Sequence, residues 1–411
     1  MNIEGSSYKV PVVRLGDITT KIGSGATPRG GKESYKTEGI SLVRSLNVYD
    51  SDFKYTNLAF IDETQARLLN NVTLEENDVL INITGASVAR CCVVPKKVLP
   101  ARVNQHVAIV RFDRTKSYPF YLQYCLVSPY YKDHLLSIAQ GGATREALTK
   151  EKLEDFRIPL PPLPTQRKIA GILSAYDDLI ENNLRRIKIL EEMAQNLYRE
   201  WFVKFRFPGH QNTRFVDSPL GKIPEGWEVH LVEKIVIRIH SGKKYNQKTA
   251  SATGAIPILD QGRSGIIGYH DDEPGVLASE DRPIIVFANH TCYQNLIMYP
   301  FSAIQNVLPF IANSKYLRDI YWLHYTTKDL VTFNDYKGHW PEFISKELIL
   351  PISYVCKNFG SIVEPILRLI FRHEKRNTNL RQTRDLLLPK LISGEVDVSE
   401  LEVAITEEAI A

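Results

Sequence analysis

The chain has 411 residues, of which 44% are hydrophobic and 24% are charged. A chain of this length is expected to bury more than one hydrophobic core, because single cores stop growing at about 250 to 300 residues. Its 51 Lys and Arg residues against 47 Asp and Glu residues leave a net charge of only +4, which excludes a binder of polyanions that acts through bulk charge, so any contact with nucleic acid must be local.

The cysteines indicate neither a disulfide framework nor a zinc site. They are odd in number and contain no C-x-x-C pair: Cys91, Cys92, Cys125, Cys292 and Cys356. We expect them to be reduced core residues. The N-terminal stretch lacks a basic region followed by an apolar one, and no run approaches the roughly 18 apolar residues that span a bilayer. These features predict a cytoplasmic protein.

Three pairs of segments recur in the same order in both halves of the chain. In the first pair an apolar segment leads to a Ser-Gly loop, in the second amide side chains precede an apolar strand, and in the third a strand with proline precedes a helical pattern. The pairs are 13–25 and 229–242, 104–110 and 305–311, and 148–161 and 344–352. They predict an internal duplication with the order head, helix, head, helix. One large α/β domain with coincidental loops is the alternative, and it does not explain the helices.

Each half also contains a segment in which seam residues recur at alternating spacings of four and three. In the first segment they are Ile169, Leu173, Tyr176, Ile180, Asn183, Ile187, Leu190, Ala194, Leu197 and Trp201. In the second they are Phe359, Val363, Ile366, Ile370, His373, Asn377, Leu380, Arg384, Leu387 and Leu391. This alternation is the heptad of a coiled coil. As a helix, the segment 169–201 would be roughly 50 Å long and could act as a spacer.

The two heptad segments can pair with each other within one chain. Thr165 is the expected N-cap of a first helix that begins at Gln166. Asn183 on one seam, with His373 and Asn377 on the other, could set the register at a cost in stability. An antiparallel pairing would give the duplicated chain pseudo-two-fold symmetry, with the heads at opposite ends. The alternative is an amphipathic helix that lies on a globular core.

Three stretches carry a resemblance to a known family. Residues 158–173 read IPLPPLPTQRKIAGIL and are followed at 177–183 by DDLIENN. Together they closely resemble the first conserved region of Type I restriction-modification specificity (S) subunits. The stretch GKIPEGW at 221–227 resembles the start of that family's second target-recognition domain. The stretch LLLPKLISGEV at 386–396 resembles its C-terminal conserved helix.

The resemblance implies a fold and a division into domains. The fold is two α/β (α+β) globular target-recognition domains in tandem, separated by two long antiparallel coiled-coil helices, with a pseudo-two-fold internal repeat. The expected boundaries are 1–158 for recognition domain 1, 159–207 for spacer helix 1, 208–351 for recognition domain 2 and 352–411 for spacer helix 2. The second seam departs from the family's apolar pattern at His373, Asn377 and Arg384, which leaves its pairing register open.

The resemblance also implies a function and partners. The chain would read a bipartite site on double-stranded DNA, one half-site per recognition domain, and dock two modification subunits that methylate adenine. Restriction subunits, which are ATP-driven translocating endonucleases, can join such a complex. No cofactor is expected in this chain, whereas S-adenosylmethionine, ATP and Mg are implied for the partner subunits. No membrane partner is expected.

The sequence contains no recognisable catalytic motif. The loop ATPRGGKE at 26–33 lacks the first Gly of the phosphate-binding pattern and ends in Glu instead of Ser or Thr. No Asn-Pro-Pro-aromatic or Asp-Pro-Pro-Tyr motif of amino-methyltransferases occurs, and the ten His residues show no metal-binding spacing. We therefore expect a non-catalytic subunit with no metal site.

Loops rich in basic and amide side chains are the candidates for contact with DNA. Direct readout uses Arg or Lys for guanine and Asn or Gln for adenine, whereas phosphate contacts fix position alone. The candidates in the first head are Lys21, Ser24, Thr27, Arg29, Lys32, Arg44, Asn47, Arg90, Gln105, His106, Thr144 and Arg145. Those in the second head are Ser241, Lys243, Lys244, Asn246, Gln261, Arg263, Asn289, His290, Tyr293, Lys337, His339 and Trp340. For each of these loops the alternative is a solvated loop without a ligand.

Two functions of other classes stay open at this point. One is a coiled-coil scaffold whose heads bind protein or carbohydrate, which predicts no salt-dependent affinity for DNA. The other is an enzyme with a pocket in the second head, which would need clustered acid and base residues. The acidic run 271–273 is more typical of a turn.

Overall fold

The computed structural model describes residues 10–140, 147–262, 265–316, 319–335 and 337–401. Contacts between backbone positions divide the chain into two compact units. The first unit comprises residues 1–181 and 377–411, and the second comprises residues 182–376. The predicted Thr144, Arg145 and Arg263 lie outside the described residues.

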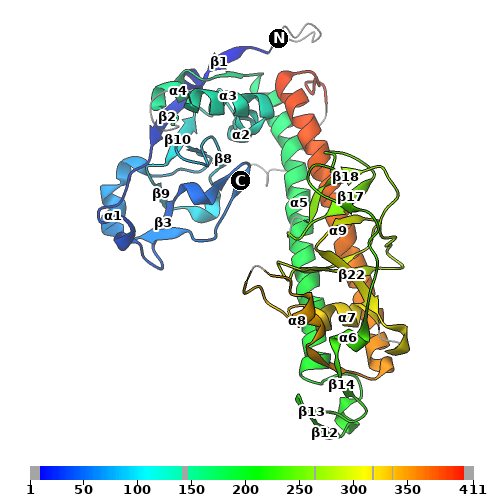
Figure 1. Ribbon diagram of the computed structural model, residues 1–411. Coiled ribbons are helices and arrows are strands. Elements are labelled where there is room, and N and C mark those ends of the chain that lie inside the picture. The colour runs from blue at the N-terminus through cyan, green and yellow to red at the C-terminus, as the bar shows by residue number, and fades with distance from the viewer. Residues whose placement is uncertain (1–9, 141–146, 263–264, 317–318, 336, 402–411) are drawn as a thin grey trace. The chain divides into compact units, whose positions relative to one another are not determined.

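Two long helices run through the chain, and both unit boundaries fall within them. Helix α5 spans Leu163–Tyr198 and continues in a π-helical turn at Arg199–Val203, and helix α9 spans Ser353–Ser393 (Figure 1). The prediction of mixed α/β content with long helices is confirmed. The expected start at Gln166 is wrong, because α5 already begins at Leu163. Pro164 is tolerated there, since the first-turn N–H groups of a helix have no partner within the helix. Among the described residues no helix combines the length and apolar character needed to cross a membrane.

Every predicted seam position of α5 and α9 is buried or half-buried. In the first unit Ile169 and Leu173, near the start of α5, share a core with Leu388 and Leu391, near the end of α9. In the second unit the end of α5 and the start of α9 likewise share a core, through Ala194 and Phe359 among others. Within each unit the two helices therefore run antiparallel.

The first unit contains a four-stranded antiparallel sheet with the strand order β2-β10-β7-β8. A smaller sheet has the order β6-β3-β9, in which β3 and β9 are parallel, and β1 pairs with β11. The strands are β1 (Val12–Arg14), β2 (Thr19–Ser24), β3 (Ile40–Val43), β4 (Val48–Tyr49), β5 (Asp52–Phe53), β6 (Ala59–Ile61), β7 (Val79–Asn82), β8 (Cys91–Val93), β9 (Ala101–Val103), β10 (Val107–Phe112) and β11 (Arg157–Pro159). The shorter helices are α1 (Glu63–Leu68), α2 (Pro119–Val127), α3 (Pro129–Gln140) and α4 (Lys150–Glu154).

The second unit contains a four-stranded antiparallel sheet with the order β15-β22-β19-β20 and a second sheet with the order β16-β21-β17-β18. Strand β14 pairs with β23, and β12 and β13 form a hairpin. The strands are β12 (Phe215–Ser218), β13 (Gly221–Pro224), β14 (Glu228–Leu231), β15 (Val236–Arg238), β16 (Lys244–Tyr245), β17 (Ile256–Leu259), β18 (Ile266–His270), β19 (Ile284–Ala288), β20 (Gln294–Ile297), β21 (Ser302–Ile304), β22 (Val307–Ala312) and β23 (Glu347–Leu350). The shorter helices are α6 (Val232–Ile235), α7 (Ile320–Thr327) and α8 (Trp340–Ile344).

The two units share one strand order. When the strands of each four-stranded sheet are numbered by their order in the chain, they lie side by side in the order first, fourth, second, third. All neighbouring strands are antiparallel. In the smaller sheet of the first unit, β3 pairs antiparallel with β6 and parallel with β9, the strand that precedes β10. In the corresponding sheet of the second unit, β17 pairs antiparallel with β18 and parallel with β21, the strand that precedes β22. β10 and β22 are therefore equivalent, and the register makes Val107 equivalent to Val307.

The central strands have apolar side chains on both faces, because the sheet lies between two cores. In the first unit Ile81 and Val110 belong to a core that includes α2, while Leu80 and Ile109 belong to a core under the smaller sheet. Such strands appear in the sequence as short continuous apolar runs instead of alternating ones. Four of the five cysteines are buried as predicted, and Cys292 is half-buried.

Candidate nucleic-acid interface

Polar loops gather at one end of the four-stranded sheet in the first unit. Because neighbouring strands are antiparallel, β2 and β7 end where β10 and β8 begin. Gln105 and His106 form the turn before β10, and the His106 carbonyl accepts a hydrogen bond from the N–H of Ile83, the residue after β7, at 3.0 Å. We call this edge, with the loops that reach it, the sheet end.

Side chains from three loops are linked at this sheet end, and all of them are exposed except Thr84, which is half-buried. The Thr27 hydroxyl donates to Gln105 Oε1, and Gln105 Nε2 lies 3.2 Å from His106 Nε2. His106 Nδ1 lies 2.7 Å from Thr84 Oγ1. A carboxamide nitrogen can only donate, so His106 Nε2 accepts and its Nδ1–H donates to Thr84. The structure thus brings together the predicted residues Thr27, Gln105 and His106.

The loop after β2 packs directly on the backbone that precedes this turn. Gly25 N–H donates to Val107 O at 2.9 Å, and Ala26 N–H donates to Val103 O at 3.0 Å. A Cβ atom at Gly25 would lie 2.1 Å from Val103 O. Glycine is required here because a backbone comes so close, and the same contact holds Thr27 beside the turn.

An aromatic and a basic side chain lie at the same sheet end, next to β8. Arg90, which precedes β8, lies over the ring of Tyr49 at 4.5 Å. Asn82, at the end of β7, donates to Ser45 O at 2.9 Å and so fixes the segment that leads to Tyr49. The predicted Arg90 therefore belongs to the same edge as Gln105 and His106.

Other predicted residues of the first unit lie elsewhere or are held in place. Lys21 donates to Asn71 O at 2.6 Å, and Arg44 donates to Asn57 O at 2.5 Å and lies over Tyr35. Ser24, by contrast, is exposed at the sheet end, where β2 ends, and Arg29 and Lys32 are exposed farther along the loop that follows β2.

Asn47 corrects the expectation from sequence. Its side chain is fully buried, donates to Lys54 O at 2.8 Å and accepts from Arg44 N–H at 3.1 Å. Asn47 therefore shapes its loop from within and is not available to a DNA base.

The second unit presents the equivalent sheet end. Gln305 and Asn306 form the turn before β22, and the Asn306 carbonyl accepts from Asn289 N–H at 2.8 Å. His290 N–H donates to Gln261 Oε1 at 2.8 Å, and His290 Nδ1 lies 3.0 Å from Lys337 O. The predicted residues Gln261, Asn289, His290 and Lys337 are therefore assembled there.

An aromatic side chain again borders this edge. Trp340 N–H donates to Asn289 Oδ1 at 2.8 Å, and Arg238 lies 6.0 Å from the Trp340 ring. Tyr293 precedes β20 and, with Gln261, lines a cavity of about 380 Å³. Trp340 and Tyr293 are both half-buried, so each presents part of its ring.

A groove of about 640 Å³ leads from this sheet end to the β16 loop. It is lined by Lys244, Asn246, Gln261 and Gln305, among others. Beside it Lys243 forms an ion pair with Asp272 at 2.8 Å. The predicted Lys244 and Asn246 thus share one groove with Gln261.

The same loop carries an aromatic stack and an acidic partner. The Tyr245 ring lies on that of His270, with ring centres 4.2 Å apart, and its hydroxyl donates to Asp272 at 2.9 Å. Hydrogen bonds from Lys243 and Tyr245 hold the pKa of the Asp272 carboxyl below its usual value.

Two predicted residues of the second unit are corrected. His339 is fully buried, with its Nε2 3.0 Å from Asp335 O, and Ser241 is buried and accepts a hydrogen bond from Lys244. Both side chains stabilise their loops and are not presented to a ligand.

Thr84, Arg238, Gln305 and Asn306 also lie at the sheet ends but are absent from the predicted set. Thr84 and Gln305 follow or precede buried strands, and Arg238 ends β15. A polar residue next to an apolar run was the available signal for Thr84 and Gln305, but many loops carry it.

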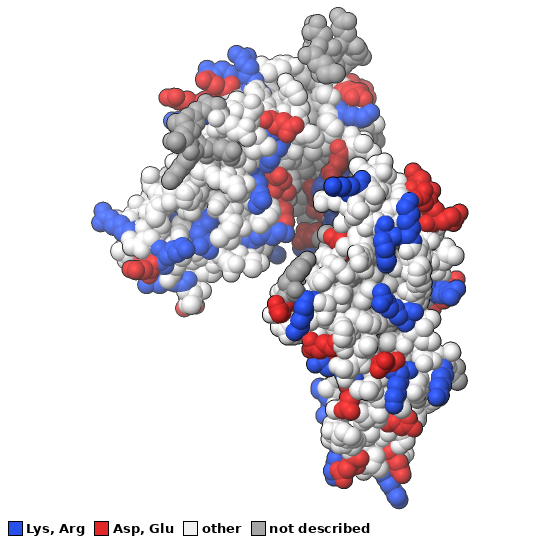
Figure 2. All heavy atoms as spheres, viewed as in Figure 1, with Lys and Arg blue, Asp and Glu red and all other residues white. Residues whose placement is uncertain are grey.

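Charge is mixed on the face of each unit that Figure 2 shows. Figure 2 shows Lys and Arg side chains interleaved with Asp and Glu on the visible face of each unit, so the described residues form no continuous basic field on that face. With a net charge of only +4 over the whole chain, we expect attraction to DNA to depend on local basic groups.

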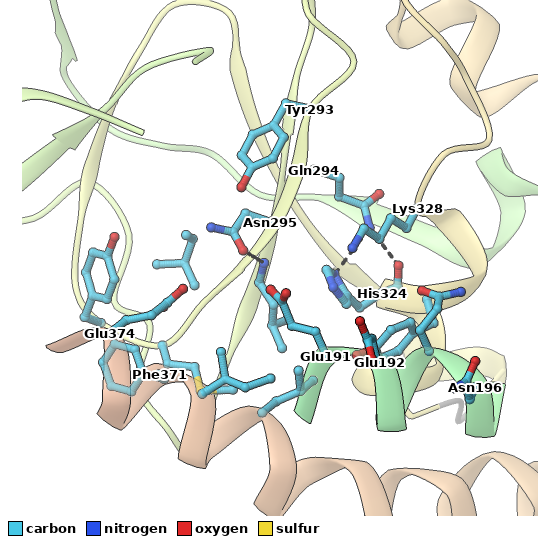
Figure 3. A pocket seen from close by; sticks show the side chains of 18 of the residues that line it. Glu191, Glu192, Asn196, Tyr293, Gln294, Asn295, His324, Lys328, Phe371 and Glu374 are labelled. Carbon is cyan, nitrogen blue, oxygen red and sulfur yellow. Dashed lines mark hydrogen bonds between the residues drawn. The ribbon is translucent and has the colours of Figure 1, made fainter. Parts of the chain in front are cut away.

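A cavity of about 450 Å³ in the second unit has a different character. Glu191 and Glu192 approach it from α5, Glu374 from α9, and His324 from α7 (Figure 3). Burial lowers the pKa of His324 to about 3, so this side chain is neutral and adds no positive charge. Arg199 and Lys328 also line the cavity, but the three glutamates outnumber these two cations, which disfavours phosphate groups, so we do not assign this cavity to DNA.

Comparisons with known proteins find similarity to one family. Residues 8–192 match the family model described as Type I restriction modification DNA specificity domain. The chain is 28% identical over 307 residues to the Type I restriction enzyme MjaIX specificity subunit of Methanocaldococcus jannaschii, a match that covers 68% of this chain and 70% of the relative. It is 26% identical over 220 residues to the putative type I restriction enzyme MjaX specificity subunit of the same organism, covering 53% and 50%.

A solved structure has the same fold. The crystal structure of the Type-I restriction-modification system S subunit from M. genitalium matches with a TM-score of 0.61 at 13% identity, covering 95% of this chain and 97% of that one. Together these matches confirm the resemblance seen in the sequence motifs.

Proposed function

We propose that this chain is a Type I restriction-modification specificity subunit that recognises a bipartite DNA sequence, with one half-site read by each unit. Its similarity to specificity subunits supports this proposal. One observation carries this proposal: the two units present equivalent sheet ends, and the same turn carries the exposed Gln105 and His106 in one unit and the exposed Gln305 and half-buried Asn306 in the other. These are side chains that read base edges through hydrogen bonds.

The dimensions of the sheet end suit a DNA groove. Four strands about 4.8 Å apart make an edge roughly 14 Å across, which is close to the roughly 12 Å width of the major groove. Side chains near the centre of the edge, such as Gln105 and Asn306, would reach bases. Exposed Arg29, Lys32 and Lys337 would contact phosphates, which fix position without reading sequence.

We propose that residues 1–158 and 208–351 are two target-recognition domains in tandem, and that residues 159–207 and 352–411 are the spacer helices. The helices would form an antiparallel coiled coil that sets the distance between half-sites. The pairing of α5 with α9 inside each unit supports this role, as does the shared strand order, which fits a pseudo-two-fold repeat.

We propose further that the chain acts as a non-catalytic subunit. It would dock two modification subunits that methylate adenine, and restriction subunits could join the complex. S-adenosylmethionine, ATP and Mg would be bound by these partners and not by this chain. A scaffold whose two heads bind protein or carbohydrate is the competing function, and it predicts no salt-dependent binding to DNA.

The experiment uses the two unit boundaries inside the helices. Seven residues are inserted between Glu181 and Asn182 and seven between Arg376 and Asn377, which leaves the contacts within each unit intact. One heptad adds about 10 Å of helix, equal to roughly three base pairs at 3.4 Å each. The methylated motif is then sequenced in cells that also express the modification subunit.

Unchanged half-sites separated by a spacer about three base pairs longer are the expected result. An unchanged spacer would contradict the role of the helices. A wild-type complex that yields no methylated motif, and whose affinity for DNA does not depend on salt, would contradict the proposed function as a whole.

A further inference from the structure

We infer that Gln105 and Gln305 are equivalent specificity residues, each of which reads an adenine in the half-site bound by its own unit. This inference rests on the proposed function and adds the residue and base that the recognition would use. It is carried by the register of the two sheets, by the exposure of both side chains and by the hydrogen-bonding capacity that Gln105 retains.

The two glutamines occupy the same place in the fold. Val107 is opposite Asn82 at the start of β10, and Val307 is opposite Ala288 at the start of β22. Gln105 and Gln305 each lie two residues before these strands. Each is the first residue of a two-residue turn that joins the small sheet to the central strand of the large one. The next residue differs, since His106 is matched by Asn306.

Both glutamine side chains are exposed although they lie beside buried strands. The turn lies at the middle of the sheet end, because β10 and β22 have neighbours on both sides. A DNA groove laid across this edge would therefore meet the turn first. Gln305 also lines the groove of about 640 Å³ with Lys244 and Asn246, which supply a cation and a second amide.

The hydrogen bonds of Gln105 prepare it for adenine. Its Oε1 accepts from Thr27, and its Nε2 donates to His106. A carboxamide has two lone pairs and two N–H groups, so one acceptor site and one donor remain. Adenine in the major groove offers the N6 amino group and the N7 acceptor, and a Gln side chain binds both at once. The contacts with Thr27 and His106 would hold the amide in one orientation before DNA binds, which reduces the cost of ordering it.

The experiment measures equilibrium binding of the full chain, in complex with its modification subunit, to the bipartite site defined by motif sequencing. Each adenine of the site is replaced in turn by 7-deazaadenine, which lacks the N7 acceptor. Wild-type protein is compared with Gln105→Ala and Gln305→Ala. Gln211→Ala serves as the matched control, because Gln211 is exposed in the turn at His210–Asn212, outside the sheet end.

We expect one adenine in each half-site at which 7-deazaadenine weakens wild-type binding by roughly 2- to 13-fold, because it removes one of the two hydrogen bonds of the bidentate contact. The affinity of Gln105→Ala should no longer respond to 7-deazaadenine at the adenine of one half-site, and should still respond at that of the other. Gln305→Ala should show the reverse pattern. Gln211→Ala should behave as wild type at every position.

Two results would overturn the inference and leave the proposed function standing. One is a sequence-selective wild-type complex in which both alanine variants keep the full sensitivity to 7-deazaadenine. The other is an effect of each variant that is equal at all positions, which would identify a phosphate contact. A wild-type complex without any sequence selectivity would instead contradict the proposed function. Thermal melting of each variant checks that it is folded.

Discussion

Arg384 on α9 forms an ion pair with Asp177 on α5 inside the first unit. Tyr124 of α2 donates to the same carboxylate at 2.7 Å, so one acidic group joins both long helices to the helix beside the sheet. Burial and the nearby Asp177 raise the pKa of the Tyr124 hydroxyl, which therefore acts as a donor. The charge of Arg384, which interrupts the apolar seam, is thus balanced by a partner on the facing helix.

Breaking this pair should destabilise the protein. Arg384→Met leaves a carboxylate whose side chain is only 25% exposed without its cation, so we expect a loss of about 1 to 3 kcal/mol in unfolding free energy. Urea denaturation checks it. Arg67→Met is the control, because Arg67 and Glu63 are 82% and 79% exposed and such pairs contribute at most about 1 kcal/mol. If both variants lose the same unfolding free energy, the pair of Arg384 with Asp177 contributes no more to stability than an exposed ion pair.

Two glycines of β2 and its loop should differ sharply when replaced by alanine. A Cβ at Gly25 would meet Val103 O at 2.1 Å and Asn104 O at 2.2 Å, whereas a Cβ at Gly23 meets nothing within 4 Å. Gly25→Ala must therefore move the backbone beside the Gln105 turn, and we expect a loss of several kcal/mol in stability together with weaker DNA binding. Gly23→Ala should be within about 1 kcal/mol of wild type. Chemical denaturation and DNA titration measure both, and a tolerated Gly25→Ala would contradict the close packing.

Stability should fall as the pH is lowered because of His324. Its pKa is lowered to about 3, chiefly by burial and further by Lys328. A His in the unfolded chain has a pKa of about 6.5. Between these values the unfolded state binds the proton and the folded state does not, so protonation favours unfolding. Full stability is present above about pH 6.5 and is lost at roughly 1.4 kcal/mol per pH unit below it, or about 2 kcal/mol between pH 7 and 5.

His324→Phe should remove this part of the pH dependence. Gln294 would keep its hydrogen bond to the backbone carbonyl of residue 324, which is 2.8 Å long. The exposed His240 is the control, and His240→Phe should keep the wild-type slope. Unfolding free energies measured from pH 5 to pH 8 give the comparison, and identical slopes for wild type and His324→Phe would refute the assignment.

Asn47 and His106 should separate stability from recognition. Asn47→Ala removes buried hydrogen bonds to Lys54 and Arg44, and we expect a loss of about 2 kcal/mol in stability without a change in the preferred DNA sequence. His106→Ala should leave stability within about 0.5 kcal/mol, because the side chain is exposed, and should relax one position of one half-site. A binding assay against all single-base variants, alongside thermal melting, distinguishes the two. A changed sequence preference in Asn47→Ala would revive its assignment as a DNA-reading residue.

Alanine variants of three candidate arginines should distinguish contacts to bases from contacts to phosphates. Alanine at a base-reading Arg44, Arg145 or Arg263 should cost about 1 to 3 kcal/mol of binding and relax one position, whereas loss of a phosphate contact weakens all sequences alike. Titrations at several salt concentrations separate these cases. If the triple variant keeps both its affinity and its salt dependence, these arginines do not contact DNA.

The sequence by itself determined the helices and the resemblance to specificity subunits. The four-three alternation specifies which face of a helix is buried, because side-chain direction repeats with the helical period whatever packs against it. Every seam position from Ile169 to Trp201 is accordingly buried or half-buried. The apolar runs that follow Gln105-His106 and Gln305-Asn306 likewise became the central strands β10 and β22.

Only the tertiary structure decided which loop side chains face solvent and which of them meet. Asn47 and His339 have the same amide or imidazole chemistry as the exposed Gln105 and His106, yet both are fully buried. A loop has no repeating geometry, so its side-chain directions depend on the backbone contacts made by segments far away in the chain. Thr84 meets His106 for that reason: antiparallel pairing of β7 with β10 places the end of one strand beside the start of the other.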